Sequence, residues 1–336
     1  MANNKNNGAK LGAKKLDMQT LLAPAALVIL YVFFSIFGNN FFTMDTFKNI
    51  LEASYYIGFM AFGVTFIIIT GGIDLSLGTV MMCSALLGGY CYKALGMPMI
   101  VAVLVTLVTA TAFGFLNGVM VAKLKLPPFI ATLGTQMMSA GLGSILTKVQ
   151  SQTWPPASDP VGGWFKQILV RTKLFGFLPI GAVWLLAFFI IATLILHKSK
   201  LGRYFFAIGS NEEAARLSGI NVDKYKIAAY TLSGVFVGMA ALFYAAVYST
   251  ITPGTGAGQE MNGITGVIIG GTSMAGGSGS MVGSLIGVFI MSTLKTGLSA
   301  CGLQAQWQTF FTGVVVIGAV LLDIYRTKAA NKVKKS

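Results

Sequence analysis

The segment IIITGGIDLSLGTVMM, residues 67–82, carries a single carboxylate, Asp74, inside an otherwise apolar region. No other charged residue occurs between Ala53 and Tyr92. An acid in such a setting is expected to satisfy backbone groups or to face a polar path, because an unpaired charge is costly in hydrocarbon. Asp74, together with Ser76, is therefore the first candidate for a specific chemical role.

The residues around Asp74 allow three roles. Gly71 and Gly72 are suited to end one helix, because glycine adopts left-handed conformations without a steric penalty. Asp74 or Ser76 then caps the next helix, whose dipole also favours negative charge at that end. We favour this interpretation. The alternatives are that Asp74 and Ser76 line a polar path for a hydroxyl-rich solute, or that Asp74 belongs to a proton or cation relay.

A second glycine-rich segment, VIIGGTSMAGGSGSMVGSLIG, has the same order of aliphatic residues, a Gly-Gly pair, small polar residues and a new apolar helix. Such symmetry is typical of transporters built from paired half-units. Small residues also serve close helix packing, and we favour packing over a path. We expect a weak internal pseudo-repeat. The further candidates for a helix break or a translocation path are Gly270, Gly271, Thr272 and Ser273.

The polar segment 197–226, HKSKLGRYFFAIGSNEEAARLSGINVDKYK, lies between apolar runs and predicts a short helix. Asn211 is suited to cap this helix, with Glu212 and Glu213 in its first turn and Gly219 at its end.

The predicted helix is a candidate docking element. Ala214 and Ala215 are small and allow the surface of a partner to approach. The alternative is a solvated connector helix with acids at the favourable end of its dipole. An aromatic patch ahead of the helix, Tyr204 to Phe206, and the length of the segment favour docking.

The sequence predicts no catalytic centre, no metal site and no bound cofactor. The phosphate-binding pattern GxxxxGK[ST] does not occur, and GGSGSMVGS has no lysine to reach phosphates. The single histidine, His197, has no further metal ligands nearby in sequence. We assign no chemistry to Glu52, Glu260, Lys295 and Asp323, which fall near the ends of predicted spans.

Composition places these candidates in a membrane. Of the 336 residues, 55% are hydrophobic and 10% charged, whereas soluble domains carry about 25% charged residues. The net charge is +14, but the basic residues gather in short clusters between apolar runs and at both ends. Nucleic-acid binding is therefore excluded, and we expect an all-α polytopic integral membrane protein.

About ten transmembrane helices are expected, at about 20 residues each. The first is a retained span rather than a signal peptide, because its apolar run is long and lacks a clear cleavage site. The eighth is short and glycine-rich, and a broken or re-entrant helix is the alternative. The expected limits are 20–38, 51–71, 75–92, 97–121, 128–147, 179–196, 227–247, 260–275, 281–298 and 306–323.

The distribution of basic residues predicts the orientation. With the N-terminus inside, cytoplasmic segments hold 17 of the 24 Lys and Arg residues, as the positive-inside rule requires. We expect cytoplasmic basic tails at 1–19 and 324–336, a transmembrane domain at 20–323, an extracytoplasmic loop at 148–178 and a cytoplasmic loop at 197–226.

Several motifs in one order resemble a known family. EAARLSG, Glu213 to Gly219, resembles the Glu-Ala-Ala-x-x-x-Gly core of the coupling loop in permease subunits of bacterial ABC importers, although INVDKYK lacks the Ile-x-Leu-Pro ending of many such loops. Together with TGGIDLSLG, PPFIATLGT and GGTSMAGGSGSMVGSLIG, this loop makes the chain similar to permeases of ribose-type monosaccharide importers from about residue 40 to 323.

The resemblance implies a homodimeric pore in the bacterial cytoplasmic (inner) membrane. It implies an extracytoplasmic binding protein that delivers ribose or a related monosaccharide, and a cytoplasmic ATP-binding subunit that holds ATP and Mg. The residues alone leave a self-contained ion-coupled carrier using Asp74 as the alternative. A structural scaffold is a weaker alternative, because scaffolds do not need interrupted helices.

Overall fold

The computed structural model describes residues 18–174, 176 and 178–333. Within these residues, seven helices are long and apolar enough to cross a membrane, by length and composition. They are α2 (Met44–Ile69), α4 (Met99–Ala122), α5 (Pro128–Leu146), α7 (Ile180–Lys198), α10 (Val222–Tyr248), α12 (Met281–Ala300) and α13 (Ala305–Val333).

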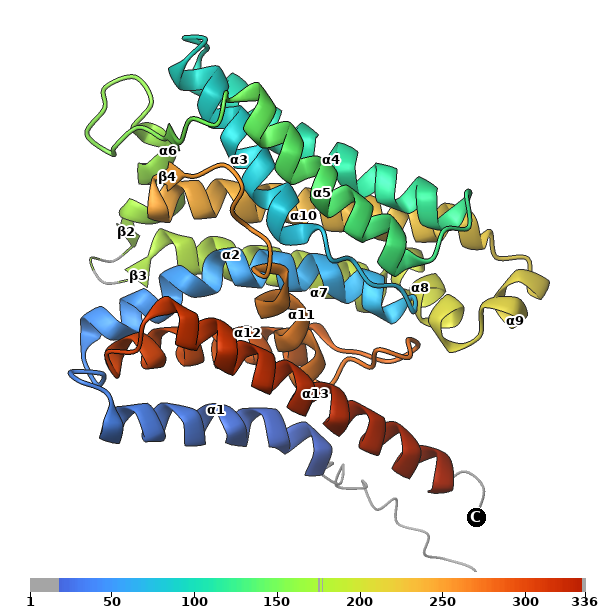
Figure 1. Ribbon diagram of the computed structural model, residues 1–336. Helices are drawn as coiled ribbons and strands as arrows, with labels where there is room; N and C mark the ends of the chain where they lie inside the picture. Colours follow the sequence, from blue (N-terminus) through green and yellow to red (C-terminus); the bar gives the residue numbers. More distant parts are fainter. Residues whose placement is uncertain (1–17, 175, 177, 334–336) are drawn as a thin grey trace, which may run out of the picture.

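Helix α2 forms the centre of the bundle. Nearly every residue from Ile50 to Ile69 is buried, which is typical of a helix that is apolar on all sides. It packs against α10, α12, α7 and the short helix α11 (Glu260–Ile269). Figure 1 shows α3 (Leu77–Lys93), α4 and α5 on one side of this centre, and α1 (Met18–Phe37) with α13 on the other.

The two ends of the bundle differ. One end carries α8 (Lys200–Ser210) and α9 (Glu212–Leu217), and both the start of α1 and the end of α13 lie toward it (Figure 1). We call this the α9 end. The opposite end carries α6 (Trp164–Lys166), the π-helix η1 (Gln167–Arg171) and two small antiparallel strand pairs. The pairs are β1 (Gln152–Thr153) with β4 (Thr250–Ile251), and β2 (Lys173–Leu174) with β3 (Leu178–Pro179).

The predicted loop 148–178 is folded onto the bundle. Trp154 is buried, its ring stacks on Phe165 with centroids 4.8 Å apart, and its Nε1 donates to the carbonyl of Ala85 in α3 at 3.1 Å. The Tyr92 hydroxyl donates to Asp159 at 2.6 Å. This loop therefore fastens the end of α3 to the strand pair β1–β4.

The eighth predicted span differs from the structure. Helix α11 contains 10 residues, and its length of about 15 Å is half of a hydrocarbon core of about 30 Å. Glu260 in its first turn receives a hydrogen bond from Gln136, which lies near the middle of α5. Helix α11 therefore starts inside the bundle, after a non-helical approach through residues 252–259. The expected limits of 260–275 were wrong at their C-terminal end, because α11 ends at Ile269, and the alternative of a broken helix agrees with the structure.

Candidate functional site

The break after α2 is a glycine-terminated turn. Gly71 has a φ of +77°, and its N–H donates to the carbonyl of Ile68 at 2.9 Å. The N–H of Gly72 donates to the carbonyl of Ile67 at 3.1 Å. This pair of bonds is the Schellman motif, which satisfies the last carbonyls of a helix. The prediction that α2 ends at these glycines is confirmed, and only Gly71 uses the left-handed conformation.

The break after α11 has the same local geometry. Gly271 has a φ of +93° and donates to Ile268 at 2.9 Å, while the N–H of Thr272 donates to Val267 at 3.2 Å. Gly270 remains helical, as the last position of the turn requires. The hydroxyl of Thr272 is buried and has no hydrogen-bond partner among the described residues, and that of Ser273 donates to Asp323 at 3.3 Å.

Asp74 does not cap α3 in the predicted way. Ser76 occupies the N-cap position, but its side chain makes no capping bond. Instead, one oxygen of Asp74 accepts from the backbone N–H of Ser76 at 2.8 Å and from the Ser76 hydroxyl at 2.6 Å. The carboxylate thus closes an Asx turn one step before the helix, because its partner is two residues ahead.

A tertiary network completes the surroundings of Asp74. Asn117 in α4 donates to Asp74 at 3.3 Å and to the Ser76 hydroxyl at 3.0 Å. Thr135 in α5 donates to the carbonyl oxygen of Asn117. Ser76 and Asn117 donate to the carboxylate, which is 2% exposed, and Thr135 holds Asn117 in place. Asp74 therefore joins α3, α4 and α5, and sequence reasoning missed Asn117 and Thr135.

Glu260 is a second buried acid, and it is 3% exposed. Its carboxylate accepts from the N–H of Gly258 at 3.0 Å and from Gln136 at 3.2 Å. The interpretation of Glu260 as a residue near a span end was wrong, because α11 begins inside the bundle. Asp74 is accordingly not the only acid within the apolar region.

Neither buried acid has a basic partner within the described part of the chain. Asp74 lies just before α3, and Glu260 lies in the first turn of α11. The partial positive charge at the start of a helix stabilises a carboxylate there. The starts of the two helices also meet, since a Cβ on Gly78 would lie 2.5 Å from Glu260 Oε2 and 2.2 Å from the Gly256 carbonyl oxygen. Gln136 bridges the two starts, because its NH₂ group donates to the Leu75 carbonyl at 3.0 Å and to Glu260 at 3.2 Å.

The predicted short helix at the other candidate site is confirmed. Helix α9 runs from Glu212 to Leu217, and Asn211 accepts from the N–H of Ala214 at 2.9 Å. Gly219 has a φ of +83°, and its N–H donates to Arg216 at 3.0 Å, so it ends the helix as predicted. Glu213 and Ala214 are exposed.

Two details of this segment differ from expectation. Ala215 is buried against Ile208 and Val222, so it offers no surface to a partner. The aromatic patch belongs to α8, where Phe205 is fully buried beside Phe66. The apolar side chain that α9 does present is Leu217, which is 85% exposed and which sequence reasoning missed.

Comparison with known proteins places this arrangement in a family. A family model described as the permease component of branched-chain amino acid transport systems matches residues 46–320. The chain belongs to this permease family.

Among its relatives, the permease is 37% identical to the ribose import permease of Escherichia coli K12 over 308 residues, which cover 89% of this chain and 91% of the relative. It is 35% identical to the ribose import permease of Bacillus subtilis over 318 residues, with 93% and 94% covered. A fructose import permease of Rhizobium meliloti is 31% identical over 317 residues, with 92% and 87% covered. The chain is a multi-pass protein of the inner membrane.

Ion pairs fix α9 against the rest of the permease. Glu212 pairs with Arg216 at 3.3 Å and with Lys226 at 2.6 Å, while Asp223 pairs with Lys125 at 2.7 Å and with Arg216 at 3.6 Å. Partial burial opposes the ionisation of Glu212, but the hydrogen bonds and charges of Lys226 and Arg216 outweigh it and lower its pKa. The hydrogen bond from Lys125 is the main cause of a lowered pKa at Asp223.

In the permease, main-chain atoms also make direct contact between the α9 end and the helix breaks, with no side chain between them. The N–H of Gly277, in the loop after α11, donates to the carbonyl of Ile69 at the end of α2 at 2.9 Å. Gly209 in α8 packs closely against both of these backbone groups. A Cβ at this position would lie 1.8 Å from the Ile69 oxygen and 2.5 Å from the Gly277 nitrogen. We call these three residues the glycine junction.

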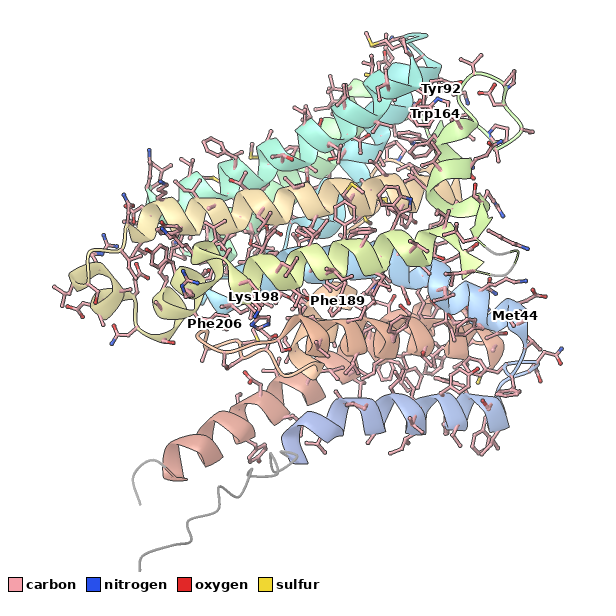
Figure 2. All side chains as sticks on the ribbon, turned by 180° about the vertical axis from the view of Figure 1, so that it is seen from behind. Met44, Tyr92, Trp164, Phe189, Lys198 and Phe206 are labelled. Carbon is pink, nitrogen blue, oxygen red and sulfur yellow. The ribbon has the colours of Figure 1, made fainter. Side chains whose placement is uncertain are left out.

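The α9 end is recognisable by its side chains. Figure 2 shows Lys198 and Phe206 at this end, with Phe189 in the middle of α7 and with Met44 and Tyr92 at the opposite end. The rings of His197 and Phe206 lie stacked with centroids 6.1 Å apart. Among the residues that the structure describes, no group of three or more His, Cys, Asp or Glu side chains is arranged to hold a metal ion.

Proposed function

We propose that this chain is the membrane-spanning subunit of an ATP-driven importer and forms the translocation path for ribose or a related monosaccharide. The sugar class is inferred from relatives named as ribose and fructose import permeases. The observation that carries the proposal is α9, a short capped helix that projects beyond the bundle (Figure 1).

The proposal assigns a side to each end. The α9 end faces the cytoplasm with both termini, in agreement with the basic residues near it. At this end a cytoplasmic ATP-binding subunit docks, and that subunit holds ATP and Mg. The permease chain itself is proposed to have no ATPase site. The folded loop 148–178 faces outward and receives an extracytoplasmic sugar-binding protein. A second copy of the chain completes the pore.

Docking of the ATPase is proposed to centre on Leu217. An exposed leucine outside the membrane gains free energy when a partner covers it, at about 25 cal/mol per Å² of apolar surface. Glu213 and Ala214 beside it leave room for approach and add one charge. The ion pairs of Glu212 and Asp223 hold α9 in a fixed position, so that movement of the ATPase moves α9 and α8 together.

The glycine junction provides a route from α9 to the interior. Helix α8 ends at Ser210, next to Gly209, and the carbonyl of Ile69 ends α2. A shift of α8 therefore acts directly on the ends of α2 and on the loop after α11. We infer that ATP-driven displacement of α9 changes the spacing of the two helix breaks. Their matching Schellman turns support the expected pseudo-repeat.

A test uses the complete complex of permease, ATPase and binding protein in vesicles. Replacing Leu217 by Asp is expected to lower sugar-stimulated ATP hydrolysis and uptake by about tenfold or more, because an interface centre of this kind contributes about 1.4 kcal/mol or more. The matched control is Leu217→Met, which keeps a large apolar side chain at the same exposed position. Normal coupling in the Leu217 variant would remove α9 from the proposed role.

The same vesicles test the alternative of an ion-coupled carrier. That carrier would move sugar with an ion gradient and without the ATPase, and it would use Asp74. In the described structure the carboxylate of Asp74 accepts hydrogen bonds from Ser76 and Asn117 and so connects α3 with α4. Uptake by the purified chain alone would favour the carrier over the importer subunit.

A further inference from the structure

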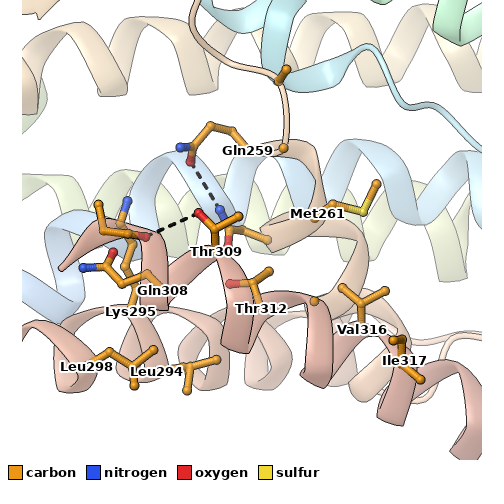
Figure 3. Close-up of a pocket in the computed structure, with 15 residues that line it drawn as sticks. Gln259, Met261, Leu294, Lys295, Leu298, Gln308, Thr309, Thr312, Val316 and Ile317 are labelled. Carbon is orange, nitrogen blue, oxygen red and sulfur yellow. Dashed lines mark hydrogen bonds between the residues drawn. The ribbon is translucent and has the colours of Figure 1, made fainter. Parts of the chain in front are cut away.

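A cavity whose lining combines apolar residues with several polar ones lies between α11, α12 and α13. Its volume is about 620 Å³, which is in the range of small-molecule sites. Figure 3 shows that side chains from all three helices line it. Its polar lining residues are Gln259, Asn262, Lys295, Gln308, Thr309 and Thr312. A polar side chain within a membrane-spanning segment costs free energy unless it has a polar partner. The convergence of six such side chains on one cavity therefore indicates a polar occupant.

Lys295 provides the positive charge of this cavity. Its Nζ donates to the Tyr56 hydroxyl at 2.7 Å and lies 5.2 Å and 5.8 Å from the ring centres of Tyr56 and Tyr248. None of the salt bridges formed by the described residues includes Lys295. An ammonium group has three N–H donors, so two remain for an occupant. The aromatic rings stabilise the cation without neutralising it.

The amides of the cavity provide acceptors. Asn262 uses its NH₂ group on Gln259 at 3.2 Å, and Gln308 uses its NH₂ group on Ser299 at 3.0 Å. The hydrogen bonds formed within the described chain leave the carbonyl oxygens of Asn262 and Gln308 and the Thr312 hydroxyl for other partners. Free donors and free acceptors therefore face the same space.

We propose that this cavity is a transit site for the monosaccharide, in which Lys295 donates to a sugar oxygen and Asn262 and Gln308 accept from sugar hydroxyls. The inference rests on the proposed importer function and specifies where the solute passes. A polyol matches the mixed donors and acceptors. A zwitterionic amino acid does not, because the lining has no Asp or Glu to pair with its ammonium group.

The first test measures the number of sugar molecules imported per ATP hydrolysed by the complete complex. Lys295→Met removes the donor and leaves an unbranched side chain that is one atom shorter. The ratio is expected to fall about tenfold, which is the effect of one lost charged hydrogen bond. Lys295→Arg is expected to retain most of the ratio. Co-purification of the variants with the ATPase shows that they are folded.

The second test labels the cavity directly, in a chain whose three native cysteines are replaced by Ser. Thr312→Cys is expected to react with N-ethylmaleimide more slowly when ribose and the loaded binding protein are present. The control is Val314→Cys, on the exposed face of the same helix, where ribose should have no effect.

The outcomes separate the two levels of the proposal. A wild-type complex that imports no monosaccharide overturns the proposed function. If the wild-type complex imports ribose, but the Lys295→Met ratio is unchanged or ribose does not protect the Thr312→Cys variant, then the cavity assignment alone is overturned.

Discussion

Asp74 shows how a carboxylate is tolerated deep in an apolar bundle. Its oxygens accept from Ser76 and Asn117, and it lies at the start of α3 where the helix dipole favours negative charge. These three hydrogen bonds take the place of the salt bridge that a buried acid would otherwise need. The role that follows is to join three helices, and it requires both oxygens to act as acceptors.

This geometry predicts an order of effects at Asp74. Asn retains one acceptor for Ser76 but turns an NH₂ group toward the NH₂ group of Asn117, so we expect a loss of about 1–3 kcal/mol in stability. Ala removes both acceptors and should yield less folded protein still. The measurement is the midpoint of thermal unfolding in detergent, compared with uptake by the protein that remains folded.

The double variant Asp74→Asn with Asn117→Asp is the control for this prediction. It restores opposed donor and acceptor groups, and it should recover part of the lost stability. An Asp74→Asn protein of normal stability that transports nothing would contradict the structural role and favour a proton or cation relay.

At the scale of the element, α9 depends on its final glycine. The φ of Gly219 is +83°, and no other heavy atom lies within 4 Å of the position where a Cβ would stand, so only backbone conformation restricts this site. Gly219→Val should cost about 1–2 kcal/mol locally and displace α9, with ATP hydrolysis no longer stimulated by sugar. Gly219→Asn is the matched variant, because asparagine tolerates the left-handed region, and it should couple nearly normally. Equal coupling in both variants would contradict the prediction.

Gly209, in the glycine junction, is expected to tolerate no side chain. Gly209→Ala would place a methyl carbon 1.8 Å from the carbonyl oxygen of Ile69, so α8 must move away from α2. Uptake should fall at least tenfold while α9 still binds the ATPase, because the docking surface is unchanged. Gly134→Ala in α5 is the control, since its Cβ would have no neighbour within 4 Å. Similar uptake in the two variants would exclude the junction from coupling.

The ion pairs around α9 predict a pH dependence. The pKa values of Glu212 and Asp223 are lowered in the folded protein, from ordinary values of about 4. Their contribution to stability is therefore present above about pH 4 and is lost as the pH falls through the lowered values. Binding of the ATPase to vesicles should be constant between about pH 6 and 8. A decrease within that window would show that other groups control docking.

The elements differ in how far the sequence predicts them. Continuous apolar runs and a capped polar helix are local features, so most spans, α9 and the glycine turns were predicted from neighbouring residues. The surroundings of Asp74 were not, because Asn117 lies 43 residues away in sequence. The setting of Lys295 depends on Tyr56, 239 residues away. Helix α11 was predicted too long at its C-terminal end, because the apolar run continues past the turn at Gly271 that ends the helix.

At the scale of the whole molecule, the two helix breaks and the α9 end form one connected region. The proposal therefore predicts that the loop after α11 changes its surroundings during the ATP cycle. A Ser278→Cys variant in this exposed loop should react with a membrane-impermeant thiol reagent from the cytoplasmic side, at different rates in resting and ATP-trapped complexes. A Lys48→Cys variant at the opposite end should not react from that side. Equal Ser278→Cys rates in both states would favour close packing over a moving path.

The opposite end of the molecule is fastened in another way. Trp154 is stacked on Phe165 and hydrogen-bonded to α3, and the strand pair β1–β4 ties the same loop to the end of α10. Aromatic stacking and strand pairing resist sliding, whereas glycine backbones in contact at the α9 end offer no interlocking side chains. We therefore expect the outer face, where the binding protein docks, to keep nearly the same structure throughout the ATP cycle. The inner half of the bundle should pivot about that face and make most of the movement.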